Sequence, residues 1–184
     1  VLAEMIAAGA SDEVTAYVQA EVDYARGEYA SAESGFHDVL EQAQDPLLQR
    51  RALRSLAEVY RDCADLGDAS PLADPAASGV TLLTDGISHF SLQYDSTLWE
   101  MLGEACFQAA QAHPDAAVGY LEQAAQSFEQ VLALGVQRDY LYANLYSVYY
   151  QLGDYQKAAE ALNAYKTAFP EDYLPYAFEG MLYI

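Results

Sequence analysis

Residues 139–172 contain two helical periods separated by a Gly-Asp turn. Apolar and small residues recur at the three- and four-residue spacing of a helix before and after this turn, at Tyr142, Leu145, Tyr146, Tyr149, Ala158, Ala161, Leu162 and Tyr165. Gly153 can adopt the positive φ that ends a helix, and Pro170 cannot continue one. The segment therefore predicts a pair of helices joined by a tight turn. A single pair buries too little surface to be stable alone, so further helices must pack against it.

The pattern returns after one period. Tyr142, Ala143 and Tyr149 are followed 34 residues later by Tyr176, Ala177 and Tyr183. A helix pair with this period resembles the tetratricopeptide repeat, which has a Gly-Asp-Tyr turn, an alanine in the second helix and a proline at its end. The residues that match this pattern at its spacing are Gly153, Asp154, Tyr155, Ala158 and Pro170.

Weaker copies of the pattern lie earlier in the chain. Gly27 opens a similar turn, Asp45 and Pro46 form a cap-plus-proline helix start, and Asp95 is placed to cap another helix. The resemblance implies an all-α fold, a right-handed superhelical solenoid of antiparallel helix pairs. We expect a single domain over residues 1–184, with repeats at about 13–46, 47–93, 96–138 and 139–172 and a partial repeat at 173–184.

Some segments depart from the repeat. Residues 1–10 are expected to be the tail of a helix, and residues 68–79, rich in Ser, Pro, Ala and Asp, an inserted loop. Residues 80–93 are expected to form a second helix, with a short strand as the alternative. In the third repeat, the second helix should begin near Pro114, and the two helices are expected to be separated by about nine residues more than the repeat allows. Close approaches of helix axes are expected at Gly103, Ala158 and Gly180.

Composition and charge limit the classes of partner. The 184 residues are 53% hydrophobic, which excludes a disordered chain. The formal net charge is −20, so nucleic acid and anionic membrane surfaces would be repelled. No apolar run approaches the roughly 20 residues that cross a bilayer, so we expect no direct membrane insertion. The partner class that remains is protein or peptide.

No arrangement of residues indicates catalysis, and we expect neither enzymatic activity nor a cofactor. His37, His89 and His113 fall in different repeats without a nucleophile or metal-binding motif beside them. The acidic residues between 62 and 74 do not have the spacing of a calcium-binding loop. Cys63 and Cys106 are expected to be buried free thiols.

The resemblance implies a concave groove lined by the first helix of each repeat. Positions 2, 5, 9 and 12 of each first helix would line it, and a protein or peptide ligand would bind there. The residues expected to contact that ligand are Tyr17, Tyr24, Arg51, Arg54, Arg61, Phe107, Tyr140, Asn144 and Tyr150. Asn144 matches one position of the clamp used by members that bind chaperone tails. The other lysine and asparagine of that clamp are absent, which argues against a chaperone partner.

Half of the basic residues lie on one expected helix. Arg50, Arg51, Arg54 and Arg61 are four of the eight lysines and arginines in the chain. One interpretation is a basic site that binds a carboxylate or phosphate group of a partner peptide. The other is that these arginines form internal pairs with Glu21, Glu100 and Glu104.

The function expected from these features is a non-catalytic scaffold that binds protein or peptide. The run from Phe169 to Tyr176 also resembles repeats of bacterial transmembrane serine/threonine protein kinases, which implies a regulatory arm of such a kinase or of a peptide-responsive regulator. The chain begins without methionine and ends on Met-Leu-Tyr-Ile inside a repeat, so we expect a fragment of a longer protein. Self-association through that last helix is a further alternative. The location, cytoplasmic or the soluble part of a membrane-anchored protein, stays open.

Overall fold

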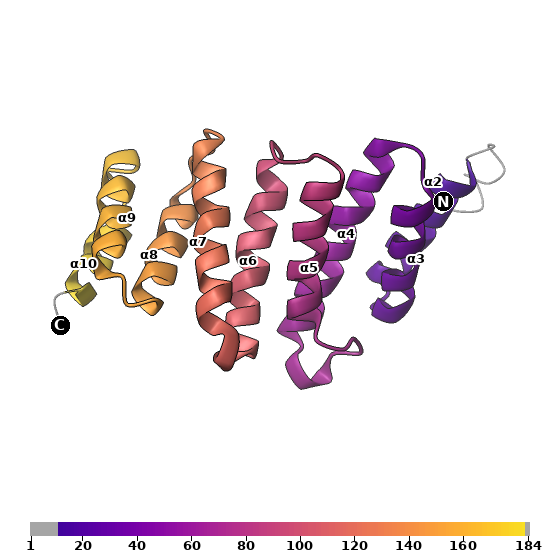
Figure 1. Cartoon of the computed structure of the whole chain (residues 1–184), viewed down its shortest axis with the longest axis horizontal. Coiled ribbons are helices and arrows are strands. Elements are labelled where there is room, and N and C mark those ends of the chain that lie inside the picture. Colours follow the sequence, from indigo (N-terminus) through magenta and orange to yellow (C-terminus); the bar gives the residue numbers. More distant parts are fainter. Residues whose placement is uncertain (1–10, 183–184) are drawn as a thin grey trace. The chain divides into compact units, whose positions relative to one another are not determined.

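The computed structural model describes residues 11–182, and within that range the chain is built from α-helices and two short 3₁₀ helices (Figure 1). The expected helix tail at residues 1–10 lies outside the described residues. The α-helices are α2 (Asp12–Ala25), α3 (Tyr29–Gln42), α4 (Pro46–Asp65), α5 (Pro75–His89), α6 (Ser96–Ala112), α7 (Ala117–Ala133), α8 (Asp139–Gln151), α9 (Tyr155–Ala168) and α10 (Leu174–Leu182). The 3₁₀ helices η1 and η2 span Gly67–Ala69 and Pro114–Ala116. The predicted all-α class is confirmed.

The helix ends follow from the caps and glycines in the sequence. The carboxylates of Asp45 and Asp95 each accept a backbone N–H of the first turn, at 2.9 and 3.1 Å. Gly27 and Gly153 have φ values of 75° and 73°, a region that costs glycine little. The predicted turns between α2 and α3 and between α8 and α9 therefore form where expected.

Two predicted boundaries were wrong. Helix α5 spans Pro75–His89, so it begins and ends several residues before the expected 80–93 helix, and the inserted loop is shorter than 68–79. No strand occurs among residues 11–182, which removes the strand alternative for this segment. In the third repeat, the extra length is in the helices, because α6 and α7 have 17 residues each and only residues 113–116 separate them.

The chain forms two compact units, residues 1–92 and 93–184. In the first unit, α2 packs on α3 and on α4, and α4 packs on α3 and on α5. Its core includes Phe36, Leu53 and Leu56, all 0% exposed. Whether the chain is one continuous domain with the predicted repeat boundaries stays a prediction.

The second unit is a run of helices in which each packs on the next, from α6 to α10. Phe128 and Tyr165 are 1% and 0% exposed and anchor its core. A Cβ built at Gly103 of α6 would lie 2.6 Å from the Phe128 ring, so the predicted close approach at this glycine is confirmed. The same prediction for Gly180 was wrong, because within the described part of the chain no atom lies within 4 Å of a Cβ placed there.

The helix cap at Asp154, in the Gly-Asp-Tyr turn before α9, can be tested directly. The side chain of Asp154 accepts the backbone N–H of Lys157 at 3.0 Å. We expect Asp154→Ala to lower the free energy of unfolding by about 1 kcal/mol, because the first turn of α9 loses this partner. The measurement is urea unfolding followed by circular dichroism. Glu171→Ala, at an exposed position of the same unit, should change stability by less than about 0.5 kcal/mol, and an equal loss in both variants would contradict the capping role.

Candidate functional site

In the first unit, the predicted site residues lie on α2 and α4, which pack against each other. The hydroxyl of Tyr17 lies 3.2 Å from the Ser55 hydroxyl, and the hydroxyl of Tyr24 donates to the Asp62 carboxylate at 2.6 Å. Both tyrosines are half-buried. The two hydrogen bonds fix the predicted tyrosines of α2 against α4, so the residues selected from the sequence share one face of this unit.

A buried polar group extends the contact at Tyr17. The Ser55 hydroxyl donates to Glu21 of α2 at 2.5 Å, and Ser55 itself is only 9% exposed. Burial raises the pKa of Tyr17, and the nearby Glu21 carboxylate raises it further, whereas Ser55 and the charge of Arg51 lower it. Glu21 is thus engaged by a hydroxyl of α4, and the guanidinium of Arg51 lies close enough to act on the tyrosine.

The arginines of α4 differ in exposure. Arg51 and Arg61 are exposed and Arg54 is half-buried. Arg61 pairs with its neighbour Asp62 at 3.0 Å, and 43% of its side chain is exposed. A pair this exposed holds its members weakly, so the Arg61 guanidinium can exchange Asp62 for another carboxylate.

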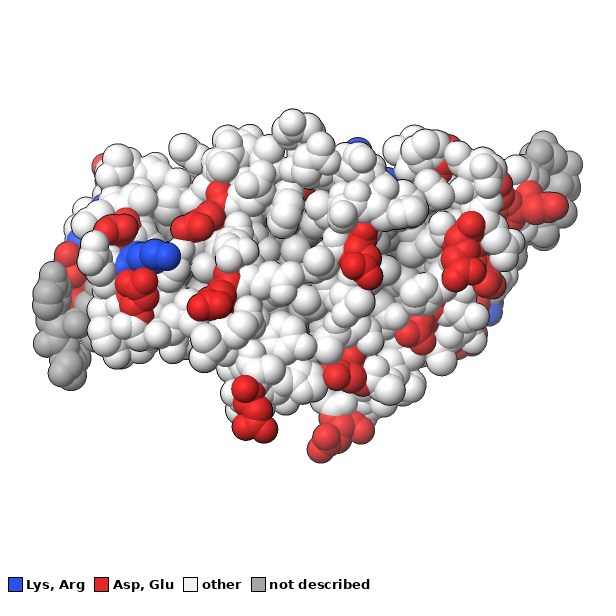
Figure 2. All heavy atoms as spheres, viewed as in Figure 1, with Lys and Arg blue, Asp and Glu red and all other residues white. Residues whose placement is uncertain are grey.

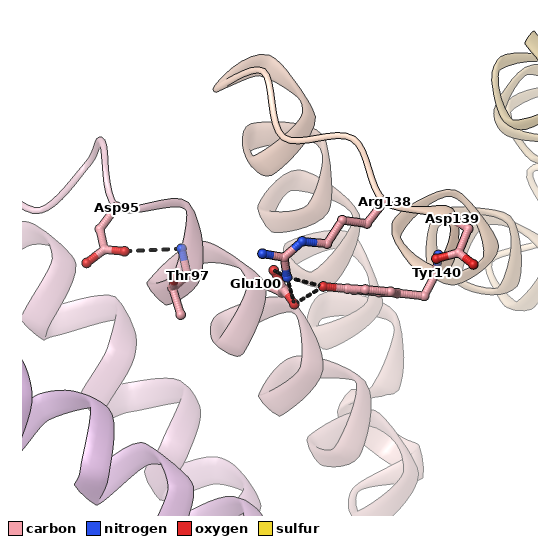
Figure 3. A network of polar contacts seen from close by, with 6 residues as sticks. All are labelled: Asp95, Thr97, Glu100, Arg138, Asp139 and Tyr140. Carbon is pink, nitrogen blue, oxygen red and sulfur yellow. Dashed lines mark hydrogen bonds and ion pairs between the residues drawn. The ribbon is translucent and has the colours of Figure 1, made fainter. Parts of the chain in front are cut away.

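In the second unit, three side chains form a polar network between α6 and α8 (Figure 3). The Tyr140 hydroxyl donates to the Glu100 carboxylate, and one guanidinium nitrogen of Arg138 donates to both Glu100 oxygens at 3.2 and 3.3 Å. That nitrogen also donates to the Tyr140 hydroxyl. Burial raises the pKa of Tyr140, and its hydrogen bond to Glu100 raises it further. Figure 3 also shows the cap of α6, from Asp95 to the backbone of Thr97.

The other predicted residues of the second unit are placed separately. Phe107 on α6 and Asn144 on α8 are half-buried, and Tyr150 at the end of α8 is 41% exposed. The Tyr150 ring contacts those of Tyr146 and Tyr155 at centroid distances of 5.8 and 5.6 Å. The structure therefore gives Tyr150 an aromatic surrounding that could stack on a peptide side chain.

Three residues that hold these faces together were not among the predicted site residues, namely Ser55, Asp62 and Arg138. Ser55 and Asp62 follow Arg54 and Arg61 by one position, so the side of α4 that meets the tyrosines of α2 is offset by one residue from the side that the repeat pattern implies. Ser55 could have been found from the sequence, because it is a polar residue next to the apolar stripe of this helix and so needs a hydrogen-bond partner. Arg138 lies just before α8, and the repeat pattern predicts contacts only for residues within helices, so it could not indicate Arg138.

No group of three or more histidine, cysteine or acidic residues could hold a metal ion in the part of the chain that the structure describes. Cys63 and Cys106 are buried free thiols, as predicted. Burial raises the pKa of the Cys106 thiol to about 12, so it stays protonated and unreactive near neutral pH. Among the described helices, none has the length and apolar character to cross a membrane.

Comparison with known proteins supports the fold alone. No family model and no curated protein matches the chain. A crystal structure of MamA protein has a TM-score of 0.70 with 19% identity, over 93% of this chain and 80% of that one. A thermophilic TPR protein of Thermus thermophilus has a TM-score of 0.53 with 21% identity, over 93% of this chain and 81% of that one.

The chain has a tetratricopeptide-repeat fold. In that fold each repeat is a pair of helices. Under the predicted repeat boundaries, α2, α4, α6 and α8 would be the first helices, which carry most of the predicted site residues, and α3, α5, α7 and α9 would be their second helices. The narrower resemblance to kinase repeats stays a prediction, as does the role of each predicted site residue.

Proposed function

We propose that this chain is a non-catalytic scaffold that binds a peptide segment of a partner protein on the face shared by α2 and α4. The tetratricopeptide-repeat fold supports a role in protein interaction. The observation that carries the proposal is that the hydroxyls of Tyr17 and Tyr24 on α2 form hydrogen bonds with α4, the helix that carries the arginines. Two of these arginines, Arg51 and Arg61, are exposed. Aromatic rings with polar tips next to arginines are the residue types enriched in protein-binding surfaces.

The charge of this face indicates an acidic peptide. In residues 1–92 the basic residues are Arg26, Arg50, Arg51, Arg54 and Arg61, so four of five lie on α4. A guanidinium group binds carboxylate or phosphate through parallel hydrogen bonds. Carboxylates of Glu21 and Asp62 accept hydrogen bonds here from Ser55 and from Tyr24, so these hydroxyls already bind carboxylates of the chain itself and the exposed arginines are the groups left to bind a ligand.

Substitution of an exposed arginine tests the proposal. The probe is an array of synthetic peptides that includes acidic, phosphorylated and basic sequences, followed by anisotropy titration of an acidic peptide that binds. We expect Arg51→Glu to weaken that binding roughly tenfold, which corresponds to about 1.4 kcal/mol. Arg51 is exposed, so the melting temperature should stay unchanged.

Arg26→Glu is the matched control, because it makes the same change of charge at the exposed end of α2. It should leave the affinity within about twofold, apart from the small long-range effect of the charge. If both variants lose affinity equally, or if acidic peptides bind no better than basic ones, the α2 and α4 face is not the site.

Self-association through α10 stays a second proposal. Tyr173 and Tyr176 are 75% and 53% exposed at the start of this helix. Light scattering of the protein and of a variant with both tyrosines replaced by serine would show whether this surface joins two copies. Equal mass of the two proteins in solution, both dimeric, would exclude these tyrosines as the contact.

A further inference from the structure

The first unit has a cleft whose lining includes Leu53 and Tyr60 of α4 but none of the arginines of that helix. It has a volume of about 850 Å³ and is walled by α3 and α5, with α4 as its floor. Helices α3 and α5 each pack on α4 but have few or no contacts with each other. The side chains that line the cleft include His37 and Leu40 from α3, Leu53 and Tyr60 from α4, and Thr81, Leu82, Asp85 and Phe90 from α5 and its end.

The cleft is apolar at its walls and acidic at its edge. Leu40, Leu82 and Phe90 are only half-buried, so they offer apolar surface that a bound group would remove from water. Asp85 is exposed at the same cleft, and no lysine or arginine is among the described residues that line it. Among the charged side chains visible in Figure 2, acidic ones are more common than basic ones.

A hydrogen-bonded chain lies at the floor. The Tyr60 hydroxyl donates to Glu33 of α3 at 2.8 Å and lies 3.1 Å from Nε2 of His37. Tyr60 lines the cleft and is 5% exposed, whereas Glu33 is not among the lining residues and reaches the cleft only through its hydrogen bond to the Tyr60 hydroxyl. The floor therefore has an aromatic ring with a carboxylate bonded to it, a combination that attracts a cationic side chain.

The second unit contains the same pair with a lysine in place. Tyr149 of α8 donates to Glu129 of α7 at 2.5 Å, as Tyr60 of α4 donates to Glu33 of α3. There the ammonium group of Lys157 lies over the Tyr149 ring, 5.1 Å from its centroid. Lys157 is the residue of α9 whose backbone N–H is bonded by the capping Asp154.

The corresponding residue in the first unit is an alanine. In α5 the cap is Asp74, and the residue whose N–H it accepts is Ala77, which lines the cleft. Within residues 11–92, the tyrosine and the carboxylate are thus present without the lysine that accompanies them in the other unit. This difference leaves both the room and the negative charge for a cation from outside.

We propose that this cleft binds a helical segment of a partner protein that presents apolar side chains on one face and a lysine or arginine beside them. The apolar side chains would contact Leu40, Leu82 and Phe90, and the cation would lie over Tyr60 near Glu33 and Asp85. A helical segment fits because the walls are helices, whose backbone groups are already paired and cannot bond to an extended chain. A helix satisfies its own backbone and needs only a groove for its side chains.

The probe for this proposal is a fluorescently labelled amphipathic peptide of leucine and lysine, compared with a peptide in which every lysine is replaced by glutamate. Anisotropy titration should show saturable binding of the first peptide and none of the second. Two variants should weaken binding at least tenfold. Ala77→Lys supplies an internal cation like Lys157, and Thr81→Trp places an indole in the cleft from an exposed position.

The matched control is Ala25→Lys, which adds the same charge at an exposed alanine of α2 outside the cleft. It should reduce affinity by less than twofold, and circular dichroism should show all three variants folded. Equal binding by the Ala77→Lys and Ala25→Lys proteins would overturn the proposal, because the attraction would then be the net charge of the chain. Absence of saturable binding to the wild-type protein, or equal binding of the glutamate peptide, would overturn it as well.

Discussion

Phe128→Ala is expected to lower the free energy of unfolding of the second unit by about 3–5 kcal/mol, the range found when a buried phenylalanine becomes alanine. Phe128 lies on α7 and is 1% exposed. Its ring faces Gly103 of α6, which has no side chain that could move into the space left behind. The surrounding helices can therefore collapse only in part, and the cavity persists. Urea unfolding followed by circular dichroism measures the loss.

The same contact allows a second test in the opposite direction. A methyl group at Gly103 would lie 2.6 Å from the Phe128 ring, so Gly103→Ala should destabilise through overpacking by about 1–3 kcal/mol, reduced by the better helix propensity of alanine. When Phe128 is already alanine, the Gly103→Ala change should instead be neutral or stabilising, because the methyl group then partly fills the cavity. Simple additivity of the two effects would contradict this packing. Val118→Ala, at a 63% exposed position of α7, is the control and should change stability by less than about 0.5 kcal/mol.

The sequence was sufficient to predict the features that depend on local chemistry. Gly27 and Gly153 end helices because their φ is positive, and Asp45 and Asp95 cap helices because a carboxylate accepts the first free N–H groups. These effects act within a few residues, so they can be read from the chain directly. The tetratricopeptide-repeat fold followed from their spacing.

The start of α5 could have been predicted, but its signal was overlooked. Asp74 followed by Pro75 repeats the cap-plus-proline signature of Asp45 and Pro46, which correctly indicated the start of α4. The surrounding serines, alanines and prolines have the composition of a loop. A loop was therefore predicted over 68–79, although Asp74 and Pro75 indicate a helix start. The correct boundary places Ala77 in the first turn of α5, where it lines the cleft.

The candidate faces depend on helix rotation, which a repeat pattern fixes only to within about one residue. A shift of one residue turns a helix by about 100°, enough to replace Arg54 by Ser55 as the side chain that meets Tyr17. The cleft was beyond prediction for another reason. It depends on the absence of a lysine at position 77 beside Tyr60 and Glu33. These three positions lie on three different helices, so their proximity cannot be read from the sequence.

Alkaline pH should destabilise the protein steeply, because buried tyrosines donate hydrogen bonds to carboxylates in both units. Tyr60, Tyr149 and Tyr165 are at most 5% exposed and donate to Glu33, Glu129 and Asp172. Burial raises the pKa of all three hydroxyls, and the adjacent carboxylate raises each further. In the unfolded chain the same hydroxyls titrate near pH 10, so the unfolded state releases protons first as the pH rises.

The sign of the effect follows from that difference. Below about pH 10 the hydroxyls are protonated in both states and the stabilisation is complete; above it, each tyrosine removes up to about 1.4 kcal/mol per pH unit until its folded pKa is reached. Urea unfolding at about pH 8 and about pH 11 should therefore show a loss of several kcal/mol. A variant with phenylalanine at positions 60 and 149 loses two hydrogen bonds and should be less stable near pH 8. Its further loss toward pH 11 should be smaller than that of the wild-type protein, because two of the titrating groups are gone. Parallel pH profiles for the two proteins would show that these tyrosine–carboxylate bonds do not control alkaline unfolding.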